Sequence, residues 1–138
     1  MEERKTAPYH WFLGTTEVAL RVGTYSMNDR LFVGLMTIDE DGCFEPFADL
    51  TVNIPQYSLH PNEAFISGDF SESNLAFIRE QGLGEILPYQ VPSGYVLYSA
   101  VSFNMEKLRD FDPHGVENHL QLQKPTNQRN TPLKQTAR

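Results

Sequence analysis

The stretch RLFVGLMTIDEDGCFEPFADLTVNIP, residues 30–55, carries two strand patterns and the turn that joins them. Residues 30–38 are almost continuously apolar, β-branched or aromatic, which is typical of a strand covered on both faces. Apolar and polar side chains alternate in residues 47–54 until Pro55 withdraws a backbone donor. Between them, Asp41-Gly42 favours a hairpin, because a type I′ turn needs positive φ at both central positions. The two segments are therefore predicted to pair as antiparallel strands.

The flanking segments extend this hairpin into a larger sheet. Residues 17–25 alternate with a period of two, so the chain is predicted to open with a three-stranded meander. Residues 63–67 predict a short fourth strand, and residues 94–103, rich in Tyr, Val and Leu, predict a buried strand. We expect one antiparallel sheet of four to five strands.

One main helix is predicted over residues 72–81. Ser71 is its expected N-cap and Gly82 the left-handed residue that ends it. Residues 105–110 predict a short second helix. Because strands and helices are segregated along the chain, the expected class is α+β, with the main helix packed on the sheet.

Charge divides the chain into three parts. Residues 9–113 contain fifteen Asp or Glu and five Lys or Arg, a net charge of −10, whereas residues 114–138 contain one Glu and four Lys or Arg, a net charge of +3. We expect a flexible N-terminus over residues 1–8, a single acidic α+β domain over 9–113, and a disordered basic polar tail over 114–138. The acidic domain is not expected to bind nucleic acid directly, since it repels phosphate. The expected partner is a basic protein surface, such as that of a nucleic-acid enzyme.

No residue pattern indicates a reaction. The four histidines, among them His60 and His119, lack metal-ligand spacing, so no metal or other cofactor is expected. The only cysteine, Cys43, is expected to be a small buried apolar residue. The chain contains neither a phosphate-binding loop nor a serine nucleophile elbow. We expect no catalytic residues.

Two kinds of side chain are candidates for binding. Asp39, Glu40 and Asp41 form an acidic turn that resembles the start of a calcium loop but lacks its terminal Glu. Tyr57 and Tyr89 lie near prolines, and exposed tyrosines bury a large area at protein interfaces with few torsions to freeze. These five are the candidate contact residues.

Residues 1–8 contain no apolar run, and no stretch elsewhere approaches the roughly 18 apolar residues of a membrane span. We expect a cytoplasmic protein without a membrane partner. The sequence leaves its oligomeric state open.

Three motifs and the predicted helix resemble a family of small bacterial proteins known only as a domain of unknown function. The motifs are LTVNIP at 50–55, NEAFI at 62–66 and PSGY at 92–95. Members of that family are often encoded on plasmids, conjugative elements and phages. The resemblance covers residues 17–103, brings no catalytic residue, and leaves the basic tail after residue 113 outside the family pattern.

The resemblance implies an accessory function of a mobile element. The favoured hypothesis is a non-enzymatic, acidic inhibitor of a host nucleic-acid-processing defence enzyme, of the anti-CRISPR or anti-restriction type. The alternative is a small-ligand or peptide-binding accessory domain with an apolar pocket between helix and sheet. A small enzyme of unknown class is the third hypothesis.

Overall fold

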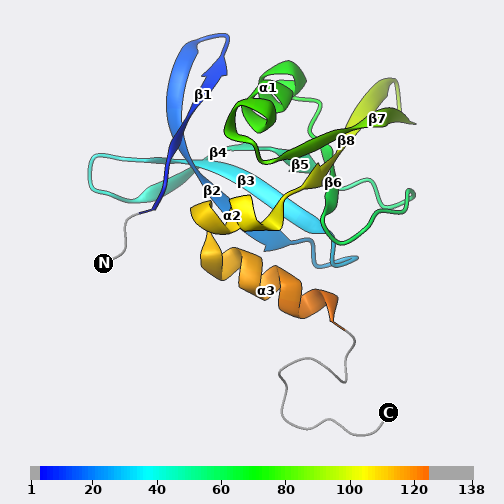
Figure 1. Cartoon of the computed structure of the whole chain (residues 1–138). Coiled ribbons are helices and arrows are strands. Elements are labelled where there is room, and N and C mark those ends of the chain that lie inside the picture. The colour runs from blue at the N-terminus through cyan, green and yellow to red at the C-terminus, as the bar shows by residue number, and fades with distance from the viewer. Residues whose placement is uncertain (1–3, 125–138) are drawn as a thin grey trace, which may run out of the picture.

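The computed structural model describes residues 4–124, which form three helices and two antiparallel sheets of four strands each (Figure 1). The strands are β1 (Ala7–Trp11), β2 (Gly14–Thr24), β3 (Leu31–Ile38), β4 (Phe44–Asp49), β5 (Thr51–Val52), β6 (Glu63–Ile66), β7 (Gly84–Ser93) and β8 (Val96–Phe103). The helices are α1 (Ser71–Gln81), α2 (Met105–Phe111) and α3 (Pro113–Gln123). The predicted α+β class is confirmed, with two sheets in place of one.

The first sheet has the order β1-β2-β3-β4, so the predicted meander gains one strand at its start. In β1, Ala7 and Tyr9 point into the core, with exposed fractions of 3% and 0%. The strand pairs with β2 from Ala7 opposite Val18 to Trp11 opposite Gly14. The expected flexible N-terminus is therefore wrong for residues 7–8, and residues 1–3 lie outside the described part of the chain.

The turn between β3 and β4 differs from the predicted two-residue turn. Only Gly42 has a positive φ, of 83°, and the Asp39 N–H donates to the Cys43 carbonyl at 2.8 Å. The Asp39 carboxylate accepts the N–H groups of Asp41 and Cys43 at 2.9 and 2.8 Å. This carboxylate thus closes the turn, and Cys43 is exposed instead of buried.

The predicted strand over residues 47–54 is divided between the two sheets at Leu50. This residue is fully buried, its N–H donates to Val33 and its carbonyl accepts the Ser67 N–H. Beyond it, β5 pairs with β6 in the second sheet, whose order is β5-β6-β8-β7. The chain therefore leaves one sheet and enters the other without a loop.

Strand β7 was not predicted because Pro88 and Pro92 interrupt its sequence. It is an edge strand, with a register shift between Ile86 and Gln90, and both features tolerate proline. A turn with Gly94 at φ 64° joins it to β8.

The main helix begins one residue earlier than predicted. Phe70, at φ 58° and ψ 38°, occupies the N-cap in place of Ser71, and no side chain caps the helix. Gly82 ends the helix in the left-handed conformation as predicted, and the Leu83 N–H donates to the Ile78 carbonyl.

The expectation of a disordered tail from residue 114 is wrong for residues 114–123, which form most of α3. Asp112 caps this helix by accepting the Gly115 N–H, and Val116 and His119 are fully buried. The residue pattern did not predict this helix, because a histidine occupies one of its buried positions. Residues 125–138 lie outside the described part of the chain.

The main core takes side chains from both sheets and all three helices. Within it, the Tyr9 and Phe47 ring centroids lie 5.7 Å apart, although β1 and β4 are opposite edges of the first sheet. The sheet is therefore strongly curled, and its two edges approach each other. A second, smaller cluster is centred on Ile54, Phe65, Val91 and Ala100.

Candidate interaction surface

Exposed and half-buried apolar side chains gather where the β1–β2 turn, the end of β4 and the 67–70 loop meet. The Trp11 ring centroid lies 5.2 Å from those of Phe12 and Phe47 and 5.7 Å from that of Phe70. Phe12, Leu13 and Phe70 have exposed fractions of 77%, 71% and 40%. We call Trp11, Phe12, Leu13, Phe47 and Phe70 the aromatic surface.

The β1–β2 turn consists of Phe12 and Leu13, between the paired residues Trp11 and Gly14. Two-residue hairpin turns are normally built from Asn, Asp and Gly, which tolerate positive φ and solvent. Two large, exposed apolar residues contribute little burial here. Contiguous exposed apolar groups of this kind mark contact surfaces.

The buried side chain of Asn74 holds the 67–70 loop in place. Its amide nitrogen donates to the Asp69 carbonyl at 3.0 Å and to the Ser67 carbonyl at 3.4 Å, and its oxygen accepts the Tyr9 hydroxyl at 2.5 Å. Burial raises the pKa of Tyr9 to about 12. The two carbonyls can only accept, so the amide nitrogen faces them and the amide oxygen faces the Tyr9 hydroxyl.

Phe70 adopts the left-handed conformation, which costs a non-glycine residue about 1–2 kcal/mol. The Phe70 carbonyl accepts the Asn74 N–H at 2.8 Å. Asn74 therefore holds both the loop and the first turn of α1. Such conformations persist where the surroundings impose them, often at binding sites. Here the imposed conformation places the Phe70 ring beside Trp11 and Phe12.

Two hollows lie along the 67–70 loop. One, of about 360 Å³, is lined by Phe47, Ala48, Asp49, Thr51, Val52, Ser67, Asp69 and Phe70. The other, of about 260 Å³, shares Val52, Ser67 and Asp69 with the first and continues to Val96 and Tyr98 on β8. The concave surface thus runs from the aromatic surface toward the β7–β8 hairpin.

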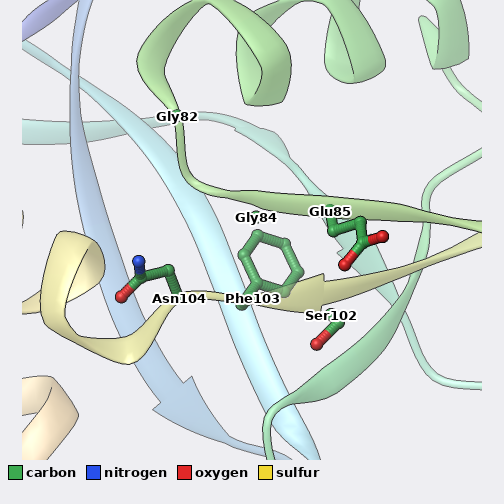
Figure 2. A pocket seen from close by; sticks show the side chains of 6 residues that line it. All are labelled: Gly82, Gly84, Glu85, Ser102, Phe103 and Asn104. Atoms are coloured by element: carbon green, nitrogen blue, oxygen red, sulfur yellow. The ribbon is translucent and has the colours of Figure 1, made fainter.

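A further hollow of about 430 Å³ lies at the start of β7 and the end of β8 (Figure 2). Its residues have roles in the fold: the Asn104 side chain caps α2, and a Cβ on Gly84 would meet the Ser102 carbonyl oxygen at 2.4 Å. Glu85 and Ser102 are cross-strand neighbours in the same hollow. We assign it no chemistry.

The structure does not bring the five predicted contact residues together. Asp39, Glu40 and Asp41 lie at the far end of the β3–β4 hairpin, and β7, which carries Tyr89, lies at the opposite end of the molecule (Figure 1). Tyr89 is 46% exposed and lines a separate hollow of about 390 Å³. Tyr57 packs on Phe65 in the second cluster and donates its hydroxyl to the Pro92 carbonyl at 2.7 Å, which gives it a structural role.

The aromatic surface was missed from the sequence. Its one local signal is Trp11-Phe12-Leu13-Gly14, an apolar run that ends at a glycine where a turn would normally be polar. Phe47 and Phe70 gave no signal, because only the folded chain brings them to Trp11.

The Thr24 hydroxyl and the Nδ1 atom of His119 lie 2.7 Å apart, within the reach of a nucleophile and its base. His119 is fully buried, and its other ring nitrogen donates to the Pro61 carbonyl at 3.0 Å. Burial lowers the pKa of this histidine. Because no substrate can reach its ring, we assign the pair to the packing of α3 on β2.

Within residues 4–124, no three His, Cys, Asp or Glu side chains gather as metal ligands would. Within the same range, no helix is long and apolar enough to cross a membrane.

Comparison with protein families gives one match. A family described as a domain of unknown function, DUF4313, matches residues 19–122, and the chain belongs to this family. The match extends to residue 122 in α3, so the expectation that the family pattern stops before residue 114 is wrong. Neither the curated proteins nor the solved structures gave a match.

Proposed function

We propose that this member of the DUF4313 family is a non-enzymatic protein-binding accessory protein that contacts its partner through the aromatic surface. The observation that carries the proposal is the display of Phe12, Leu13 and Phe70 in solvent on a loop and a turn held by buried neighbours. Interface energy concentrates in large anchors of this kind. Holding them in place before binding reduces the entropy lost on association.

The charge of the chain favours a protein over a lipid surface. An apolar hairpin tip can also insert into a bilayer, but such tips usually combine apolar with basic residues. Here the formal net charge is −7, and Asp49 and Asp69 lie beside the aromatic surface. Anionic headgroups would be repelled.

The size of the hollow between α1 and the sheet disfavours a drug-sized ligand at that place. The hollow between α1 and the β7–β8 strands has a volume of about 230 Å³. Pockets for drug-sized ligands usually measure about 300–1,000 Å³. The aromatic surface, by contrast, is open to solvent at the Phe12 turn, where both central residues are exposed.

The most specific partner that the charge suggests is a basic nucleic-acid-processing enzyme of host defence. The net charge of −10 over residues 9–113 would complement such an enzyme and speed the encounter at low salt. With such a partner, the protein acts in the cytoplasm of a host cell that carries the mobile element. This part of the proposal rests on the charge and on the family resemblance.

Site-specific photo-crosslinking tests the proposal. The photoreactive residue p-benzoylphenylalanine replaces Phe12 in the full chain, and the protein is irradiated in its native host. We expect one discrete protein adduct, which a second change, Phe70→Ser, removes because both positions belong to one surface. The matched control carries the same group in place of the exposed Glu40 and should give no such adduct.

The proposal fails if position 12 gives no adduct, or if the adduct also forms from position 40. Flotation with phosphatidylcholine–phosphatidylserine vesicles tests the membrane alternative. Binding to the vesicles that depends on Phe12 would replace the proposed protein partner with a membrane.

A further inference from the structure

The hollow of about 360 Å³ beside the aromatic surface combines negative charge with aromatic rings. Two of its lining residues are Asp49 and Asp69, and two are Phe47 and Phe70. Carboxylates attract a cation, and the face of an aromatic ring attracts one within about 6 Å of its centroid. We call this site the acidic hollow.

The carboxylates of the acidic hollow have no partner in the described chain. No Lys, Arg or His in residues 4–124 lies within 4 Å of either Asp49 or Asp69, and neither carboxylate accepts a hydrogen bond there. Some carboxylates do have partners in the described chain: that of Asp39 closes its own turn, and that of Asp112 caps α3 and pairs with Arg4. Within residues 4–124, the charge of the acidic hollow is therefore unmatched.

The backbone of the acidic hollow is held in place on both sides. Asp49 ends β4 opposite Gly34, and the Asp69 carbonyl is fixed by the buried Asn74 amide. Burial raises the pKa of the nearby Tyr25, and the negative charge of Asp49 adds to that rise. The Asp49 charge thus acts on its surroundings, and no cationic side chain of residues 4–124 pairs with it.

We infer that the acidic hollow receives a lysine or arginine side chain of the partner protein, on a segment whose adjacent apolar residue packs against Phe12 and Phe70. The inference rests on the proposed function and adds the chemistry of the partner to it. It also moves the expected basic contact from the turn at residues 39–41 to Asp49 and Asp69. Electrostatic complementarity of this kind sets partner specificity.

A peptide selection provides the probe. Random seven-residue peptides displayed on phage are selected on the immobilised full chain. We expect enrichment of one Lys or Arg next to a large apolar residue. A synthetic peptide with the enriched sequence is then compared with a copy in which norleucine replaces the basic residue. The expected loss of affinity is about tenfold, which corresponds to about 1.4 kcal/mol.

Two double variants with equal changes in charge locate the contact. With Asp49→Asn and Asp69→Asn, the preference for the basic residue over norleucine should fall below twofold. With Glu40→Gln and Asp41→Asn in the distant turn, the preference should stay near tenfold. Equal urea midpoints for the two variants would confirm that both are folded.

Separate results overturn the inference and the proposed function. A selected peptide that loses binding in Phe12→Ser/Leu13→Ser but shows no basic preference overturns the inference and leaves the proposed function standing. A basic preference that survives Asp49→Asn/Asp69→Asn overturns the inference too. If no peptide is enriched, or if the bound peptide is indifferent to Phe12→Ser/Leu13→Ser, both fail.

Discussion

Two of the three hairpin turns of the first sheet, β1–β2 and β3–β4, have opposite chemistry. The β3–β4 turn is acidic, and the Asp39 carboxylate satisfies the backbone of that turn. The β1–β2 turn instead exposes Phe12 and Leu13, and its neighbour Phe70 holds a left-handed conformation. Hairpin formation explains the polar residues of the β3–β4 turn. It does not explain the exposed apolar residues of the β1–β2 turn. The apolar turn is therefore the better indicator of function.

The largest expected effect comes from removing the side chain that holds the 67–70 loop. Asn74→Ala should lower the free energy of unfolding by about 3 kcal/mol, because the buried Tyr9 hydroxyl and two loop carbonyls lose their partner. Asp39→Ala, which removes the corresponding side chain of the acidic turn, should cost only about 1 kcal/mol since its partners are exposed. Urea unfolding measures both, and equal losses would contradict the contrast between the two turns.

A second pair of changes tests the strain at Phe70. Because Phe70 has a positive φ, Phe70→Gly should be more stable than Phe70→Ala by about 1 kcal/mol. Phe44, at the start of β4, has the same exposed fraction of 40% but lies in a strand without positive φ. There glycine should be less stable than alanine by roughly 0.5–1 kcal/mol. The same sign at both positions would refute the strain at Phe70.

A smaller effect, remote from both turns, comes from pH. The folded pKa of His119 lies below its ordinary value of 6.5 because burial disfavours the charged ring. The unfolded chain therefore takes up a proton first as pH falls. This contribution should leave stability unchanged above pH 6.5 and reduce it as pH falls from 6.5 toward the folded pKa. Urea midpoints between pH 7.5 and 5 measure it, and His119→Gln should flatten the curve; an unchanged slope would contradict the assignment.

The smallest expected effect on stability is at the exposed tip of the β1–β2 turn. Phe12→Ser/Leu13→Ser should change the free energy of unfolding by less than about 0.5 kcal/mol, because both side chains are largely in solvent. The comparison variant Glu40→Gln/Asp41→Asn should be equally neutral. A loss above 2 kcal/mol at the apolar tip would show that Phe12 and Leu13 serve folding, and would remove the reason to assign them to binding.

The sequence predicted the elements whose signals are local. The β3 pattern, the alternation that became β4 and β5, and the Gly82 end of α1 all depend on neighbouring residues. Features that depend on contacts between distant parts of the chain could not be predicted from the sequence. The division at Leu50 depends on hydrogen bonds to two different sheets, β7 tolerates its prolines because it is an edge, and α3 buries a histidine against β2.

The candidate binding residues were even harder to predict from the sequence than the fold. The acidic turn was visible because its three carboxylates are consecutive in the chain. The aromatic surface joins residues 11–13, Phe47 and Phe70, which approach only after the first sheet curls and Asn74 fixes the loop. Composition gives the number of aromatic residues but not their convergence.

The contact site of a bound peptide on the full chain tests the central claim most directly. Two-dimensional ¹H–¹⁵N spectra recorded with the selected peptide locate the affected backbone amides. We predict that the shifted signals cluster in residues 11–13, 47–49 and 67–72, while those of residues 39–42 stay unchanged. Shifts confined to residues 39–42, with the signals of Phe12, Phe47 and Phe70 unmoved, would contradict the account and return the binding site to the acidic turn.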